Sequence, residues 1–177
     1  SASVRSPDIR ALAIAAGWQP HQRIICKVSP GVLIASLVVQ GLPHDALTLV
    51  INGASVGGIV NGGIGLTVIG QRIRVDNQGA VFGGGGIGGV GGGATATQRG
   101  GGTINADGGG GGTGAGLSSS GPVSMVGSSQ GAAGQQVTWS GTVFAGDTRV
   151  YADGGAGGAG GALGVAGVGG GFGVWGG

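Results

Sequence analysis

Near the N-terminus, apolar residues recur at helical spacing and fall on one face of a helix. Ser6 stands where an N-cap is expected, and Pro7 stands at the first helical position. Gly17 is placed to end the helix in a left-handed conformation. The pattern therefore predicts a helix over residues 7–16, with Trp18 folded back onto it as in a Schellman ending.

The pattern then changes to runs of β-branched and other apolar residues. Residues 23–28 and 32–39 are two such runs, and Ser29-Pro30-Gly31 between them is a turn signal. We expect two strands in a hairpin-like arrangement. Because both runs are apolar on two faces, we also expect them to need a partner surface.

A strand-and-turn pattern occurs twice further along the chain. Residues 47–58 and 73–84 each contain a strand, an Asn-containing turn, a short strand and a glycine run. The shared design indicates an internal repeat about 26 residues long, whose units bury their apolar faces by stacking. A weaker third copy is expected over residues 137–151.

The longest glycine tracts keep a period of three. Residues 85–93 and 154–162 consist of triplets that begin with two glycines. Three residues per turn is the geometry of the polyproline II helix, which has no internal hydrogen bonds. We expect several such polyglycine II helices to pack side by side, because glycine lets backbones approach closely. Collagen is excluded, since none of the five prolines lies in a glycine tract.

The composition of the chain favours an ordered structure over a disordered one. Glycine supplies 50 of the 177 residues, aromatic residues make up 4% and charged residues 8%. Mean hydropathy is +0.37 and the net charge only +2, the reverse of a disordered chain. We expect a mainly β and irregular fold. A short N-terminal helix and β unit would fill residues 1–45, and strand–turn repeats with a polyglycine II sandwich would fill 46–177.

Candidate catalytic chemistry is sparse. The basic residues form no run beside an aromatic platform, which argues against a nucleic acid partner. Matches to G-x-G-x-x-G arise by chance in such tracts, and no helix follows to hold a phosphate. Apart from Asp45 beside His44, neither His21 nor His44 has a neighbour at metal-ligand spacing, and the chain has no glutamate. We therefore expect no enzyme activity, no cofactor and no metal.

Two further features are read as structural. Cys26 has no second cysteine to pair with and is expected to be a small buried hydrophobe. No apolar run is long enough to span a bilayer, and the first residues lack the zones of a signal peptide. The chain therefore reads as soluble.

Four segments of small polar and apolar residues interrupt the glycine tracts, and function concentrates on loops that a rigid scaffold holds. These segments are residues 94–99, 103–107, 117–120 and 128–130. Phe172 and Trp175 in the last glycine tract are either binding anchors or pins for the chain end. The candidate contact residues are Thr95, Thr97, Gln98, Arg99, Asn105, Leu117, Ser119, Phe172 and Trp175.

The order of these blocks resembles the glycine-rich tail-tip and tail-fibre adhesins of tailed bacteriophages. The resemblance is carried by residues 8–18, by the β-runs, and by the Asn-containing turns that lead into glycine tracts. It covers nearly the whole chain. In these adhesins, including T-even type fibre-tip proteins, stacked polyglycine II helices project variable loops toward a receptor on the host surface.

The resemblance implies a receptor-binding protein of the virion tail tip that acts at the outer surface of the host cell. Its receptor would be an outer-membrane protein or a surface polysaccharide such as lipopolysaccharide. Residues 1–45 would attach the chain to a tail or fibre protein, in a homotrimeric context. Other interpretations stay open: a purely structural tail-tip or assembly module, a polysaccharide-cleaving enzyme, or an ice-binding bundle suggested by Ala156, Ala159 and Ala162.

Overall fold

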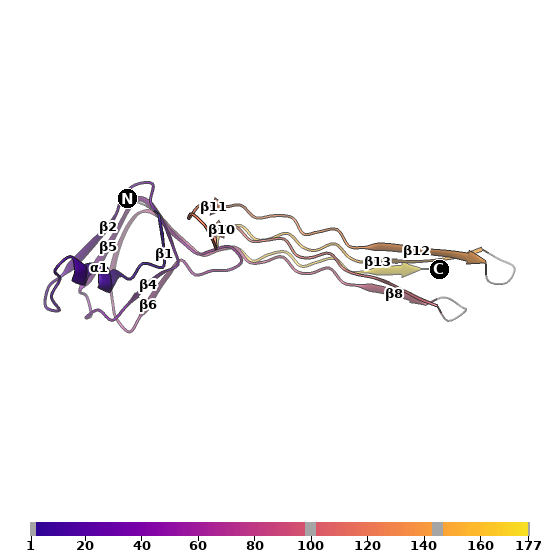
Figure 1. The fold of residues 1–177 in the computed structure, drawn as a ribbon, viewed down its shortest axis with the longest axis horizontal. Coiled ribbons are helices and arrows are strands. Elements are labelled where there is room, and N and C mark those ends of the chain that lie inside the picture. Colours follow the sequence, from indigo (N-terminus) through magenta and orange to yellow (C-terminus); the bar gives the residue numbers. More distant parts are fainter. Residues whose placement is uncertain (1–2, 98–101, 143–146, 177) are drawn as a thin grey trace. The chain divides into compact units, whose positions relative to one another are not determined.

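The computed structural model describes residues 3–97, 102–142 and 147–176. The fold is mainly β, as expected, and the described residues contain a single short helix. The chain forms two units (Figure 1). The strand unit consists of Ser1–Gly84 and Ala115–Val126, and the glycine unit consists of Gly85–Gly114 and Gly127–Gly177.

This division corrects the boundary expected at residue 45. Strand β2 (Ile24–Val28) lies before that position and strand β5 (Leu47–Gly57) after it. The two strands pair in parallel, Ile24 with Leu47 and Val28 with Ile51. A boundary at residue 45 would therefore cut through one sheet.

The strand unit is a stack of parallel strands. β2 pairs with the first half of β5, and β3 (Leu33–Ala35) pairs with the second half. β5 pairs in turn with β7 (Arg74–Phe82). The hairpin expected of residues 23–39 is wrong, because β2 and β3 both pair with β5 and not with each other. The chain instead climbs one rung at a time, as in a solenoid.

The two predicted repeats are neighbours in this stack. β5 lies in residues 47–58 and β7 in residues 73–84, and they pair over most of their length. Stacking of the repeats is confirmed, but Asn52 and Gly53 do not turn the chain. β5 runs through them with a shift of register between Asn52 and Ser55.

A second side of the stack is formed by β4 (Leu37–Gln40) and β6 (Leu66–Ile69), which are also parallel. Alternate side chains of β4 and β6 point into a core shared with β5. On β2 the same alternation exposes Ile25, which is the one large hydrophobic residue of residues 23–39 that is exposed. Residues 23–39 were expected to need a partner surface because both of their faces are apolar. That reason does not hold, because most of their apolar side chains pack into the core of the strand unit.

Helix α1 (Ile9–Ala15) covers the N-terminal end of the core. Ile9 is buried in it, and Trp18 packs against it. The N-cap is Asp8, whose Oδ1 accepts a hydrogen bond from the Ala11 N–H at 2.9 Å. The helix therefore begins two residues later than predicted.

Ser6 is not the cap because it continues the neighbouring strand. β1 (Val4–Arg5) pairs in parallel with β3, and the Ser6 N–H donates to the Ala35 carbonyl at 2.7 Å. At the other end of α1 the predicted Schellman ending is confirmed. Gly17 has φ +86, and the Trp18 N–H donates to the Ala13 carbonyl at 2.9 Å.

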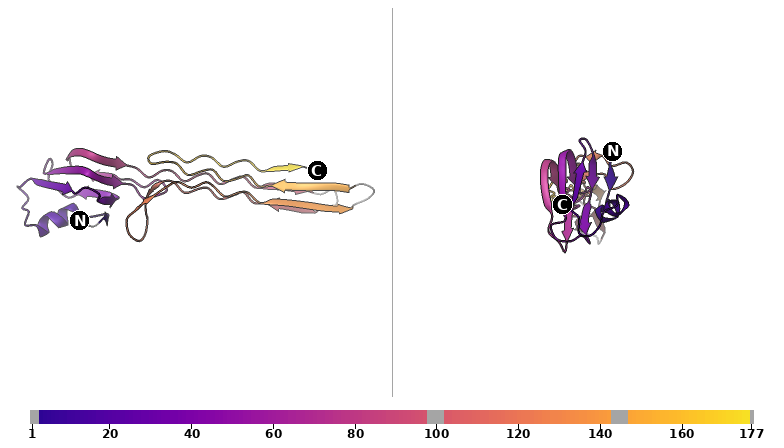
Figure 2. Two further views of the ribbon diagram at one scale, coloured as in Figure 1. Left: turned by 90° about the horizontal axis from the view of Figure 1, so that it is seen from above. Right: turned by 90° about the vertical axis from the view of Figure 1, so that its left-hand side faces the viewer.

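Five extended segments without helix or strand pairing make up most of the glycine unit. We name them segment A (85–93), segment B (107–114), segment C (127–135), segment D (154–162) and segment E (165–173). Figure 2 shows the segments running alongside one another.

Backbone hydrogen bonds join the segments at every third residue. Gly86, Gly89 and Gly92 of segment A donate to segment E at 2.8 Å. Segment A also bonds to segments B and D, while segment D bonds to all four others. Segments A and B therefore form one row, and segments E, D and C form a second row against it.

Short strands extend the segments at one end of the glycine unit. β8 (Ala94–Thr97) and β9 (Thr103–Ala106) pair antiparallel. β12 (Gln136–Thr142), β13 (Asp147–Asp153) and β14 (Val174–Gly176) form an antiparallel sheet. Small side chains fill the core there: Ala94, Ala96, Ala106 and Ala152.

The third repeat expected over residues 137–151 is wrong. That region forms the antiparallel pair β12–β13 in the glycine unit, whereas the two true repeats are parallel and lie in the strand unit. Within the described chain, no helix has the length and apolar character needed to cross a membrane.

Candidate contact surface

The strand end of the glycine unit gathers most of the candidate contact residues. Segment A leads into β8, segment C into β12 and segment E into β14, while β9 and β13 lead back into segments B and D. All five strands therefore emerge at the same end of the segments (Figure 1). The connections over residues 98–101 and 143–146 lie outside the described residues, and with them the candidates Gln98 and Arg99.

Alternation along β8 and β9 decides which side chains face outward. Ala94 and Ala96 are buried, while Thr95 and Thr97 between them are exposed. Thr95 pairs with Asn105 across the hairpin, and the Thr95 hydroxyl donates to Asn105 Oδ1 at 2.9 Å. The β8–β9 pair thus exposes a hydroxyl and an amide on one face, while the small side chains of Ala94 and Ala96 pack into the core on the other face.

Phe172 and Trp175 lie on the same end. Phe172 is 94% exposed and Trp175 is 67% exposed. Trp175 lies opposite Ala152 in the sheet, and only its backbone is held by strand pairing. Of the two interpretations left open above, an exposed ring fits an anchor for a partner better than a pin for the chain end.

Leu117 and Ser119 are not part of this surface. They belong to the strand unit, where β10 (Gly116–Leu117) pairs with β11 (Met125–Val126). Leu117 is fully buried, and its N–H donates to the Gly58 carbonyl at 2.9 Å. This corrects its assignment as a contact residue, because the side chain packs inside the fold. Ser119 is exposed in the connection between β10 and β11.

Residues 128–130 do not form a loop either. The Ser129 N–H donates to the Thr113 carbonyl at 2.9 Å, and the Gly160 N–H donates to the Ser129 carbonyl at 2.9 Å. This stretch is therefore part of segment C, which lies between segments B and D. Residues 128–130 are polar, so the sequence did not indicate that their backbone makes hydrogen bonds at every third residue, as the glycine tracts do.

Sequence reasoning did not single out a set of exposed aliphatic side chains on the glycine segments. Within each segment they recur three residues apart, which is the signal that could have identified them. The exposed residues are Ile87 and Val90 on segment A and Val165 and Val168 on segment E. Since two residues of each triplet face neighbouring segments, the third is free to face outward.

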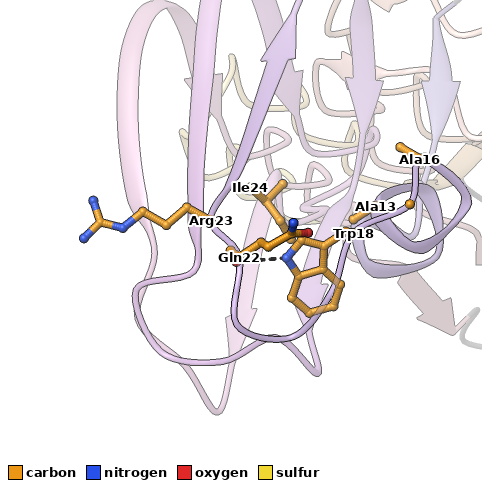
Figure 3. Close-up of a pocket in the computed structure, with 7 residues that line it drawn as sticks. Ala13, Ala16, Trp18, Gln22, Arg23 and Ile24 are labelled. Carbon is orange, nitrogen blue, oxygen red and sulfur yellow. Dashed lines mark hydrogen bonds between the residues drawn. The ribbon is translucent and has the colours of Figure 1, made fainter.

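A hollow of about 330 Å³ lies beside Trp18 in the strand unit (Figure 3). The indole N–H donates to the Gln22 carbonyl at 2.9 Å, and Gln22 Oε1 accepts from the Gln19 N–H at 2.9 Å. Figure 3 shows the Arg23 side chain directed away from the ring. The polar groups here serve the local turn and do not converge on a ligand.

No cluster of three or more potential metal ligands is found among the described residues. Burial raises the pKa of the Cys26 thiol, which lowers its reactivity at neutral pH. Comparison of the chain with protein-family models, curated proteins and solved structures found no match. The function is therefore inferred from the contact surface itself.

Proposed function

We propose that this chain is a bacteriophage tail-tip adhesin that recognises a receptor on the host-cell surface through the strand end of its glycine unit. The observation that supports the proposal is the exposure of Phe172 and Trp175 at the same end as the Thr95–Asn105 pair. Exposed aromatic rings are favoured binding anchors, and short hydroxyl and amide groups supply adaptable hydrogen bonds.

The scaffold in this proposal is a sandwich of polyglycine II helices. The threefold step of the hydrogen bonds supports it, since a helix with three residues per turn directs every third N–H to the same side. Such helices bond only to neighbours, so a packed set holds its end strands firmly. Rigid support of this kind lowers the entropy that a contact surface loses when it binds.

The receptor in this proposal is an outer-membrane protein or lipopolysaccharide. The described residues of β8, β9 and β14 carry no charged side chain. Contacts made through these three strands would rest on apolar surface and neutral hydrogen bonds, so their share of the binding should depend little on ionic strength. The strand unit would attach the chain to a tail or fibre protein, which places the chain at the virion tail tip.

The test is binding of the purified chain to intact Gram-negative cells and to strains lacking single outer-membrane proteins or lipopolysaccharide sugars. We expect saturable binding that disappears with one surface component. Phe172→Ala and Trp175→Ala should each weaken binding about tenfold or more, the range of an interface anchor. Ile25→Ala, which removes an exposed hydrophobic residue from the strand unit, should leave binding unchanged.

Two outcomes would redirect the proposal. Failure to bind any host, with the chain folded, would favour a structural tip or assembly module. Release of reducing sugar from host polysaccharide would favour a cleaving enzyme, in which paired carboxylates do the chemistry.

Ice binding is a second candidate, and one observation favours it. Ala162 and Ala159 of segment D accept hydrogen bonds from the N–H groups of Val165 and Val168 of segment E, at 3.0 Å and 2.8 Å. Ala156, the third alanine of the row, accepts one from Gly171 at 2.7 Å. Residues three apart on such a segment repeat at about 9 Å, which makes a regular row. A thermal-hysteresis measurement separates the candidates, because an adhesin should give none.

A further inference from the structure

The two ends of the stack of strands in the strand unit differ in what lies over them. At the N-terminal end, β1 pairs with β3 and helix α1 lies over the core, while β2 pairs only with β5 among the described strands. At the far end, no described strand pairs with the outer edge of β7 or of β6. A solenoid needs a cap at each end, because a terminal rung otherwise exposes both backbone groups and core side chains.

Exposure along the core columns shows that apolar positions reach the surface at the far, open end. Paired residues of parallel strands point to the same side of a sheet, so Val75 of β7 continues the column of Leu49. Leu49 is 0% exposed, but Val75 is 40% exposed. In the second sheet Val39 is 0% exposed and its partner Val68 is 37% exposed. The core therefore reaches the surface at these two positions, whereas the column of Ile51 ends in the polar residue Asn77.

We propose that the open end is where a second copy of this chain docks, with its β7 antiparallel to β7 of the first copy. A head-to-tail stack would need the N-terminal end of the next copy, where α1 lies over the core and β1 lies over β3. Two open ends can meet only face to face, which is a twofold interface.

The charges on β7 are complementary to themselves under this symmetry. Arg74 and Asp76 flank Val75, are exposed, and form no ion pair with another described residue. When two β7 strands cross at Val75, Arg74 lies opposite Asp76 of the partner subunit, and the reverse pair forms by symmetry. The two Val75 side chains meet on the core side, where each covers the apolar end of the other.

The available area suits a specific but modest interface. β7 has nine residues, which at about 3.3 Å per residue gives an edge about 30 Å long. Two sheets about 10 Å apart, with their outer side chains, make the end about 20 Å wide. The contact would then cover about 600 Å² on each copy, or about 1,200 Å² in total, the lower limit for stable specific complexes.

The experiment is sedimentation equilibrium of the full chain and of variants at the open end. We expect a monomer–dimer equilibrium with a Kd in the micromolar range, about 1–100 μM. Val75→Lys should weaken dimerisation at least about a hundredfold, because two lysines would face each other in the apolar contact. Ile25→Lys, at another exposed hydrophobic residue of the strand unit, should leave the Kd unchanged.

A charge exchange tests the pairing itself. Arg74→Asp and Asp76→Arg should each weaken the dimer about tenfold by placing like charges opposite one another, and the double variant should recover the original Kd within about threefold. Both side chains are exposed, so circular dichroism should show the fold unchanged. A wild-type monomer at about 0.1 mM, a trimer, or a folded double variant that stays monomeric would overturn the proposal.

Discussion

Two adjacent glycines of segment B offer a sharp test of why the glycine unit needs its composition. A Cβ added to Gly111 would overlap the carbonyl oxygen of Gly88 in segment A, whereas a Cβ added to Gly110 meets nothing within 4 Å. Neither glycine has a positive φ, so alanine is compatible with the backbone at both positions. Gly111→Ala and Gly110→Ala therefore differ in packing alone.

The expected free-energy change can be worked from the contacts around Gly111. To admit a methyl group, segments A and B must move apart, which strains the bonds from Gly88 N–H to Gly112 and from Gly91 N–H to Gly109, each 2.8 Å. Overpacking costs about 1–3 kcal/mol, and each weakened hydrogen bond costs about 1 kcal/mol. Reduced freedom of the unfolded chain offsets about 0.4–1 kcal/mol. The net loss for Gly111→Ala is about 2–5 kcal/mol.

Thermal unfolding followed by circular dichroism measures the difference. For a chain of this size about 1 kcal/mol corresponds to about 2–4 °C in Tm, so Gly111→Ala should lower Tm by about 4–20 °C. Gly110→Ala should leave Tm unchanged or raise it by a few degrees, about 1–4 °C, since only the entropy term acts. Equal Tm values for the two variants would refute the idea that close backbone contact requires glycine at position 111.

Three other predictions concern the strand unit. Asp8→Ala should lower the free energy of unfolding by about 0.5–2 kcal/mol through loss of the N-cap, while Ser6→Ala should change it by less than about 0.5 kcal/mol; urea denaturation compares them. Gly17→Ala should cost about 1–2 kcal/mol because φ is +86 there, and an equally stable variant would contradict the Schellman assignment. Because burial raises the pKa of Cys26, its contribution to stability should be complete below about pH 8 and decline as the pH rises through the folded-state pKa. Denaturation midpoints from pH 7 to 10 test this, and Cys26→Val should remove that decline.

Local signals predicted the local structure well. The end of α1 at Gly17 follows from glycine chemistry, and the threefold triplets of segments A and D anticipated the spacing of their hydrogen bonds. Stacking of residues 47–58 on residues 73–84 followed from their similarity. In each case the deciding interactions lie within a few residues or within one repeat.

Long-range pairing was harder to predict. A turn between two β-branched runs is typical of a hairpin, yet Ser29-Pro30-Gly31 joins strands that both pair with β5, because the apolar columns align only in the parallel arrangement. Leu117 follows a glycine tract and resembles a loop residue. It is buried because the chain returns to the strand unit, which no local pattern indicates. Thr95 and Asn105 could be named as candidates, but their mutual hydrogen bond depends on the register of β8 and β9.

The connectivity of the two units has a consequence for how the gene can change. The chain passes from the strand unit to the glycine unit after Gly84, returns at Ala115 and leaves again after Val126. A single recombination event between related genes at codon 84 would therefore exchange the β10–β11 hairpin together with the glycine unit. The new hairpin would then have to pack against the strand unit of the other gene. Replacement of the β8–β9 hairpin or the β12–β13 pair crosses no such junction, so diversification of this lineage should proceed by exchange of those two hairpins within an inherited frame.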